Sequence, residues 1–335
     1  MHSQQQQLNR RQLLRAFGGM VVLGGVAGCG NDQEGADGAV SYEGEVAVSH
    51  LDTNISATPF LVASELGIYQ QEGLKLELVS FPGGTDTVRG VATMGMGMPA
   101  TLPAFTAYQK GQRELRLVAG CDNRSRAVFL VPADSPLRSI EDLRNKRIAV
   151  SRPGSITTYF ANRIAREVGL TPGRDVEILH VGGTTESWTA TTQGLADVSW
   201  SFPPTSEILI NRGEARVLFD SSEYVTSWTD TTHWATQSFI DDSPEVLDAF
   251  LRAQRRAMDV IANDPARAAP AYARRANIPE QVAVSVLEQA SNGLGLQIDR
   301  AALDEVIAAG RELGQLDPAA LDVDAVIADG FVDNR

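Results

Sequence analysis

The feature that most constrains the fold is an alternation of strand-like and helix-like stretches, which occurs twice along the chain. One series extends from a strand at 46–48 to a strand at 127–131, and a second extends from 147–150 to 216–219. Beyond residue 243 the periodicity is helical only. Helix starts are predicted there at Pro244, Pro265, Pro279, Asp299 and Pro318. The pattern predicts an α/β protein of two lobes, each a mixed sheet flanked by helices, with a C-terminal helical return that completes the first lobe.

The lobe boundaries follow from where each series starts and stops. Lobe 1 is expected to comprise residues 45–131 and 236–335, and lobe 2 residues 132–232. The connections near 131–136 and 229–236 are predicted to be hinges. A chain of 335 residues is long enough for this arrangement, because single cores rarely grow beyond ~250–300 residues.

Composition excludes several classes of function. The chain has 29 Lys and Arg against 42 Asp and Glu, a net charge of -13, which argues against binding nucleic acid. Two Cys and four His leave little material for a zinc or iron–sulfur centre, so neither a metal nor another cofactor is expected. The sequence hallmarks of serine hydrolases, zinc peptidases and phosphate loops do not occur, and no catalytic residue is predicted.

The first residues are predicted to direct export. Arg10 and Arg11 precede an apolar stretch at 16–28, which is typical of a secretory signal and too short for a membrane-spanning helix of about 20 residues. The paired arginines resemble a twin-arginine signal, although Asn9 stands where Ser or Thr is usual. Both the twin-arginine and the general secretory route fit this pattern. Residues 1–28 are therefore expected to be a signal peptide.

A lipid anchor is predicted at the end of that signal. Val26-Ala27-Gly28-Cys29 resembles the lipobox of bacterial lipoproteins, in which the cysteine receives a diacylglycerol and becomes the first mature residue. Residues 29–44 are polar and rich in Gly and acidic residues, as expected of a tether. The protein is thus expected to be exported and lipid-anchored, at the outer face of the cytoplasmic membrane or in the periplasm. Cys121 is predicted to be a buried, inert thiol.

Ligand contacts are predicted where strands end and helices begin, because ligands of open α/β sheets bind outside the carboxyl ends of strands. Ser155 and Thr157 are the expected contacts for an anionic group, with Arg124 or Arg152 as countercharge. All four Trp fall near predicted edges or hinges, which favours an apolar or aromatic ligand body. The predicted ligand-binding residues are Asn54, Phe81, Gly83, Met98, Ala100, Thr101, Arg124, Ser155, Thr157, Trp188, Trp200, Phe202 and Trp234.

Four stretches resemble a known family. The stretch Leu61–Glu77 is similar to the first helix-loop-strand segment of the periplasmic binding proteins for nitrate, sulfonates, taurine and thiamine precursors. The stretch Ser139–Val150 is similar to the segment with which the chain of those proteins enters the second lobe. Thr192–Val198 and Pro244–Ala257 resemble that family's second-lobe helix-to-strand turn and its post-hinge helix. The stretch 89–100 departs from the family pattern, which leaves its register open. It superficially fits a dinucleotide fingerprint, but its Pro and Met residues favour a wall of a ligand cleft.

The resemblance implies the periplasmic-binding-protein type II fold and the role of a monomeric solute receptor. Its lobes would close over a small organic molecule and deliver it to the permease of an ABC importer. A sulfonate, a taurine-like compound, a thiamine precursor or an aromatic acid is the implied ligand. Two alternatives stay open: an enzyme of the related thiamine-pyrimidine synthase branch, whose Cys-rich motif the chain lacks, and a metal-binding lipoprotein, which needs His and carboxylates at the strand ends.

Overall fold

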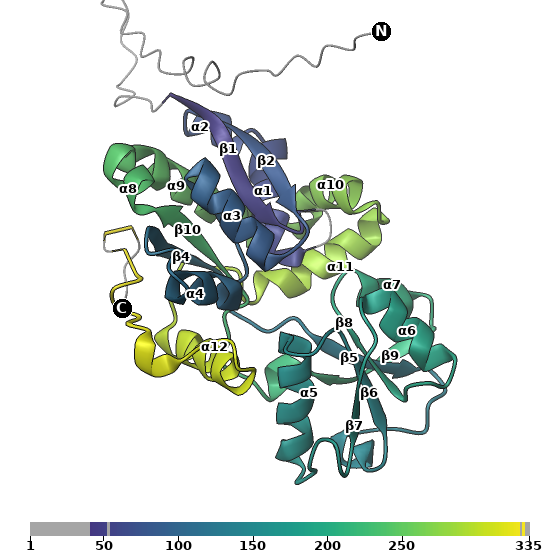
Figure 1. The fold of residues 1–335 in the computed structure, drawn as a ribbon. Helices are drawn as coiled ribbons and strands as arrows, with labels where there is room; N and C mark the ends of the chain where they lie inside the picture. Colours follow the sequence, from purple (N-terminus) through teal and green to yellow (C-terminus); the bar gives the residue numbers. More distant parts are fainter. Residues whose placement is uncertain (1–40, 52–53, 329, 332–335) are drawn as a thin grey trace, which may run out of the picture. The chain divides into compact units, whose positions relative to one another are not determined.

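The computed structural model describes residues 41–51, 54–328 and 330–331, and this part of the chain forms two five-stranded sheets flanked by helices (Figure 1). The predicted signal, the lipidation site and the predicted tether up to residue 40 lie outside the described residues. The sequence predicts a tether that extends to residue 44, but residues 42–44 belong to the first strand, Tyr42–Ser49, because they pair with Leu74–Leu76. The first sheet has the order β2-β1-β3-β10-β4, with β1 (Tyr42–Ser49), β2 (Leu74–Phe81), β3 (Met96–Met98), β4 (Leu115–Asp122) and β10 (Thr231–Thr236). The second has the order β7-β6-β8-β5-β9, with β5 (Val128–Pro132), β6 (Arg147–Val150), β7 (Glu177–His180), β8 (Val198–Ser201) and β9 (Ala215–Asp220).

Each sheet contains one antiparallel strand that the chain enters from the other sheet. In the first sheet β1 is parallel to β2 and β3, whereas β10 is antiparallel to β3 and β4. In the second sheet β6 is parallel to β7 and β8, whereas β5 is antiparallel to β8 and β9. The chain crosses between the sheets at residues 123–127, the first crossing segment, and at 221–230, the second crossing segment.

These crossings correct the predicted lobe boundaries. The sequence pattern places 127–131 in lobe 1, but β5 is hydrogen-bonded within the second sheet, so the predicted hinge at 131–136 lies beyond the crossing. The predicted second hinge at 229–236 is largely strand β10 of the first sheet. A short apolar run fits either sheet equally well, and only its pairing partners decide where it belongs.

Twelve helices cover the sheets in the described residues. They are α1 (Thr58–Glu65), α2 (Ile68–Gln71), α3 (Gly84–Met94), α4 (Thr101–Gln109), α5 (Ile156–Glu167), α6 (Thr184–Thr192), α7 (Thr205–Asn211), α8 (Gln237–Asp242), α9 (Pro244–Asn263), α10 (Pro265–Ala276), α11 (Glu280–Ser291) and α12 (Arg300–Glu312). Short 3-10 turns occur at η1 (Ile55–Ala57), η2 (Ile140–Leu143), η3 (Ser221–Glu223) and η4 (Pro318–Ala320). No helix among these residues is long and apolar enough to span a membrane.

The C-terminal helices return to the first sheet, as the sequence predicts. Helices α9, α10 and α11 pack against α1 or η1, and Phe250 of α9 lies against Phe60 and Tyr69 with ring centroids 5.8 and 6.2 Å apart. Helix α12 differs, because it contacts α4 on the first-sheet side and α5 on the second-sheet side. There the Tyr159 hydroxyl donates a hydrogen bond to Glu305 at 2.6 Å.

Candidate functional site

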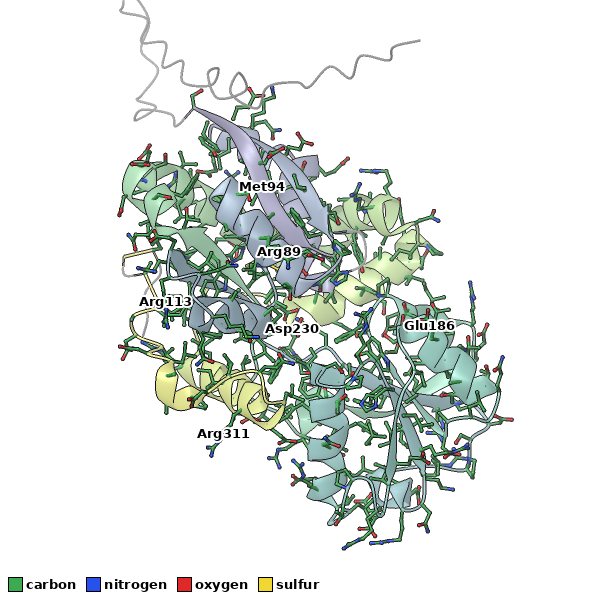
Figure 2. All side chains as sticks on the ribbon, in the orientation of Figure 1. Arg89, Met94, Arg113, Glu186, Asp230 and Arg311 are labelled. Atoms are coloured by element: carbon green, nitrogen blue, oxygen red, sulfur yellow. The ribbon has the colours of Figure 1, made fainter. Side chains whose placement is uncertain are left out.

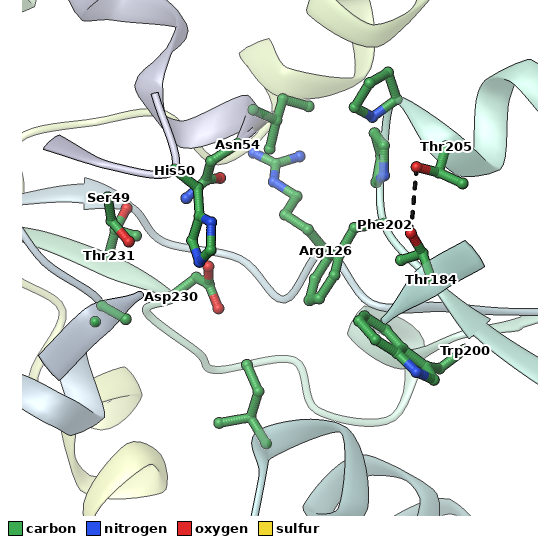
Figure 3. A pocket seen from close by; sticks show the side chains of 16 residues that line it. Ser49, His50, Asn54, Arg126, Thr184, Trp200, Phe202, Thr205, Asp230 and Thr231 are labelled. Atoms are coloured by element: carbon green, nitrogen blue, oxygen red, sulfur yellow. Dashed lines mark hydrogen bonds between the residues drawn. The ribbon is translucent and has the colours of Figure 1, made fainter. Parts of the chain in front are cut away.

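A cavity of about 450 Å³ is lined by residues of both sheets and both crossing segments. This volume lies in the range of small-molecule sites, which is ~300–1,000 Å³. In Figure 3 His50 and Asp230 lie on one side of the cavity, and Trp200 and Thr184 lie on the opposite side. The position agrees with the rule that predicted it, since the cavity lies where strands β1 and β8 end.

The second sheet supplies an aromatic wall. Trp200 lies in β8 and Phe202 follows that strand, and their rings meet edge to face with centroids 5.5 Å apart. The Trp200 indole Nε1–H donates to the Gly182 carbonyl at 3.2 Å, which fixes the ring plane. Beside this wall the Thr184 hydroxyl is hydrogen-bonded to that of Thr205 at 3.5 Å (Figure 3).

The first sheet supplies a polar wall just beyond β1. His50 has a left-handed backbone with φ 46°, an uncommon conformation for a residue other than Gly. Burial lowers the pKa of its imidazole, so the ring is neutral at neutral pH. Asn54 caps η1, because its Oδ1 accepts the Ser56 amide N–H at 3.0 Å. This bond leaves the amide NH2 of Asn54 available as a donor.

A buried ion pair lies at the base of the cavity. Arg126, of the first crossing segment, donates from Nε and Nη2 to the fully buried Asp122 carboxylate, with N–O distances of 2.7–3.1 Å. Its Nη1 and Nη2 also donate to the carbonyls of Gln289 and Ala290, each at 2.9 Å. Ser56 donates to the second oxygen of Asp122 at 2.9 Å. Arg126 is thereby fixed against the end of α11.

Asp230, in the second crossing segment, is the acidic side chain that lines the cavity. Its backbone N–H donates to the Asp122 carbonyl at 2.8 Å, and its carbonyl accepts the first N–H of α4 from Thr101 at 3.0 Å. Its carboxylate accepts one hydrogen bond, from Trp228 Nε1 at 3.4 Å. Desolvation, followed by the nearby Asp122 charge, raises the pKa of Asp230 to about 7. Figure 2 shows Asp230 between the elements of the two sheets.

Four of the predicted ligand-binding residues line the cavity, namely Asn54, Ala100, Trp200 and Phe202. Arg124 instead faces an adjoining cavity of about 340 Å³, where it donates to Ser222 at 2.6 Å and pairs with Asp220 at 3.5 Å. The adjoining cavity shares Arg126 with the first.

The predicted anion contacts at the start of α5 are hydrogen-bonded among themselves. The Ser155 hydroxyl caps the helix by accepting the Thr158 N–H at 3.3 Å, and Thr157 Oγ1 accepts the Ser151 N–H at 3.0 Å. Neither lines the cavity, although Ile156 between them does. The exposed Arg152 is also outside the lining residues.

The remaining predicted residues also lie outside the cavity lining. Met98, Thr101 and Trp234 are buried in the first-sheet half, where the Trp234 ring meets Phe105 edge to face at 5.6 Å. Trp188, a residue of α6, packs against the apolar cluster of Leu130, Leu209 and Ala215. Phe81 packs against the core at the end of β2, and Gly83 precedes the lining residue Gly84. These positions adjoin the predicted strand ends, but their side chains pack into the core or serve as turns.

Two charged site residues are missing from the sequence prediction, Arg126 and Asp230. Each is a single charged residue in a connecting segment, and no periodic pattern distinguishes it from a solvated surface charge. The signal that could have found Asp230 is its position in the predicted second hinge, where a charge lies next to two lobes.

The described residues contain one free cysteine, Cys121. Within them no group of three or more His, Cys, Asp and Glu side chains is placed to hold a metal ion. Cys121 is buried, as predicted, and desolvation raises the pKa of its thiol well above the ordinary value. Such a thiol is neither a ready nucleophile nor a ready metal ligand.

Comparison with known proteins identifies the family. A family model described as NMT1/THI5 like matches residues 54–268, which is more than half of the chain. The chain belongs to this family. No curated protein sequence matches it. The family and the structural matches below confirm the resemblance to ABC-transporter solute-binding proteins that the sequence motifs indicate.

Solved structures with the same fold include two sulfonate-binding proteins. The alkanesulfonate-binding protein SsuA from Xanthomonas axonopodis pv. citri, bound to MOPS, is similar with a TM-score of 0.68 and 19% identity over 88% of this chain and 99% of that chain. The aliphatic sulphonate binding protein SsuA from Escherichia coli has a TM-score of 0.70 and 17% identity, over 88% of this chain and 94% of that chain. A mutant of DSZB in complex with biphenyl-2-sulfinic acid has a TM-score of 0.65 and 16% identity, over 86% of this chain and 97% of that chain. The periplasmic-binding-protein fold is thus confirmed, and the family supports a role in binding a small molecule for an ABC importer.

Proposed function

We propose that the protein is a lipid-anchored solute receptor, which captures one small organic molecule between its two lobes and delivers it to an ABC importer. The observation that supports this most is the cavity lined by both sheets and both crossing segments. A ligand that contacts both sides favours a closed arrangement only as far as its contacts are better there than in an open one. The crossing segments are the proposed hinges.

The ligand is proposed to have an apolar or aromatic body that lies against Trp200 and Phe202. The other proposed contacts are Asn54, Arg126 and Asp230, which supply hydrogen-bonding groups from the opposite side. The similar structures include an alkanesulfonate-binding protein bound to MOPS and a DSZB mutant in complex with biphenyl-2-sulfinic acid, and both of these ligands are small organic molecules. Sulfonates, taurine-like compounds, thiamine precursors and aromatic acids are therefore the starting set for a ligand screen.

The anchor is proposed from the sequence. Cys29 follows Val26-Ala27-Gly28 directly, and the acidic tether that begins there leads into β1 at Tyr42. A receptor held by lipid stays near the membrane permease, which raises its effective concentration at the importer. The receptor is proposed to act as a monomer.

A thermal-shift screen of the mature protein, followed by calorimetry of the best compound, tests the proposed function. We expect Trp200→Ala to weaken binding about tenfold or more, because it removes an aromatic wall of the cavity. Trp188→Ala is the matched control, since Trp188 belongs to the same half of the molecule but packs outside the cavity. Equal loss in both variants would contradict the site.

The same incubation separates a receptor from an enzyme. Stoichiometric protein should return the bound compound chemically unchanged after prolonged incubation. Formation of a product would contradict the receptor and favour the synthase-branch alternative.

A further inference from the structure

The charge lining the cavity is unfavourable for an anion. Three ionisable side chains line it among the described residues: His50, Arg126 and Asp230. His50 contributes no positive charge at neutral pH, because burial lowers its pKa. Arg126 is neutralised by Asp122, its partner in the buried ion pair. With all carboxylates ionised, Asp122, Arg126 and Asp230 together carry a net charge of -1.

Arg126 also lacks the free donors that an oxyanion needs. A guanidinium has five N–H groups, and sulfonates or carboxylates are typically gripped by two of them in parallel. Nε donates to Asp122, Nη2 donates to Asp122 and Ala290, and Nη1 donates to Gln289. One N–H is left, so a two-point contact with an oxyanion would require the buried pair with Asp122 to break.

Asp230 is in the opposite situation, because its carboxylate has unused acceptor capacity. Its only side-chain hydrogen bond in the described residues is the 3.4 Å contact from Trp228, and a carboxylate can accept about four. The side chain is partly accessible from the cavity. The facing wall, which contains Trp200 and Phe202, suits a flat or cationic group, since aromatic faces attract cations.

We infer that the cavity selects a nitrogen cation, such as a protonated amine or amidine, carried on an apolar or aromatic body, and that Asp230 is its charged contact. This inference rests on the proposed function and narrows its ligand class. Sulfonates and simple aromatic acids are then disfavoured by the uncompensated carboxylate. Compounds that combine a ring with a basic nitrogen are favoured.

A charge-matched set of probes tests the inference: benzamidine, benzamide and benzenesulfonate share a ring and differ in charge. We expect benzamidine to bind most tightly to the full mature protein, as measured by calorimetry. Tighter binding of benzenesulfonate or of benzamide would overturn the inference and leave the receptor proposal standing. No saturable binding of any probe or of the screened compounds would contradict the proposed function itself.

The variant Asp230→Asn adds a direct test of the residue. It keeps the shape and the acceptor for Trp228 but removes the charge, so benzamidine affinity should fall at least tenfold while benzamide affinity changes little. Asp304→Asn, on the exposed surface of α12, is the matched control for the change in net charge. Unchanged benzamidine affinity in Asp230→Asn would overturn the inference.

The change of ligand affinity with pH distinguishes a cationic ligand from an anionic one. The groups facing Asp230 are Asp122 and the neutral Cys121 thiol of β4, Arg126 of the first crossing segment, and His50 beyond β1. With a pKa of about 7 in the free protein, Asp230 ionises between pH 6 and pH 8, so benzamidine affinity should rise about tenfold over that interval. At lower pH a protonated His50 would repel the cationic ligand, so this group also makes benzamidine affinity rise with pH. A falling affinity would overturn the inference, and Asp230→Asn should abolish the rise.

Discussion

At the scale of single residues, the Asp230 carboxylate is expected to lower the stability of the fold when it is ionised. The carboxylate is desolvated and lies near Asp122, which raises its pKa from 3.8 to about 7. Between pH 4 and 7 the folded chain therefore holds a proton that the unfolded chain has released. The free energy of unfolding must fall as pH rises through that interval, because the folded state binds more protons.

This linkage predicts that Asp230→Asn stabilises the ligand-free protein at high pH. At pH 8 we expect the free energy of unfolding to rise by about 2 kcal/mol. This is well below the free energy that the full pKa shift corresponds to, because the side chain is partly open to water. The melting temperature should rise by a few degrees at pH 8 and match the wild type near pH 4. A difference between the two proteins that stays constant from pH 4 to pH 8 would show that Asp230 does not titrate as proposed. Such a trade-off between stability and function is common at binding sites.

Residue-level prediction succeeded where the backbone decides and failed where side-chain direction decides. The four Trp residues all lie near predicted edges, yet only Trp200 among them lines the cavity. Trp228 stacks on Tyr159 with centroids 6.0 Å apart, and Trp234 packs on Phe105. A one-residue change in strand register reverses which face a side chain occupies, and no pattern in a short strand fixes that register.

At the scale of elements, four of the five predicted helix starts in the tail open α-helices, whereas Pro318 opens only the three-residue 3-10 turn η4. Pro244 and Pro265 start α9 and α10, and Asp264 and Asp299 cap α10 and α12 by accepting backbone N–H groups at 3.1 and 3.2 Å. These signals are local, so the sequence contains them completely. The exchange of β5 and β10 between sheets is a long-range pairing, and the five residues of β5 contain no signal for it.

The N-terminal segment has a prediction of its own. When the full chain is produced in a lipoprotein-exporting bacterium, Cys29→Ser should prevent lipid attachment and leave the protein in the aqueous phase of a detergent partition. Cys121→Ser, which changes the buried cysteine in β4, should leave lipidation intact. Intact mass measures the acyl groups directly. Persistent acylation of Cys29→Ser would contradict the lipobox assignment.

At the scale of the whole molecule, the proposed receptor function requires one ligand to contact both halves of the described chain. The aromatic wall belongs to the second sheet, the polar wall to the first, and Arg126 and Asp230 to the segments that join them. Ser221 donates its backbone N–H to Ala127 at 3.0 Å, so the two crossing segments are directly hydrogen-bonded to each other. A ligand held between these walls is in a position to couple its binding to their closure.

Hydrogen exchange of the mature protein, measured with and without its best-binding compound, tests whether one ligand contacts both halves. We predict slower exchange at both strand-end regions, 49–51 and 54–56 of the first sheet and 200–205 of the second, together with the crossing segments. Slowing confined to one sheet, or to a surface away from the cavity, would contradict it.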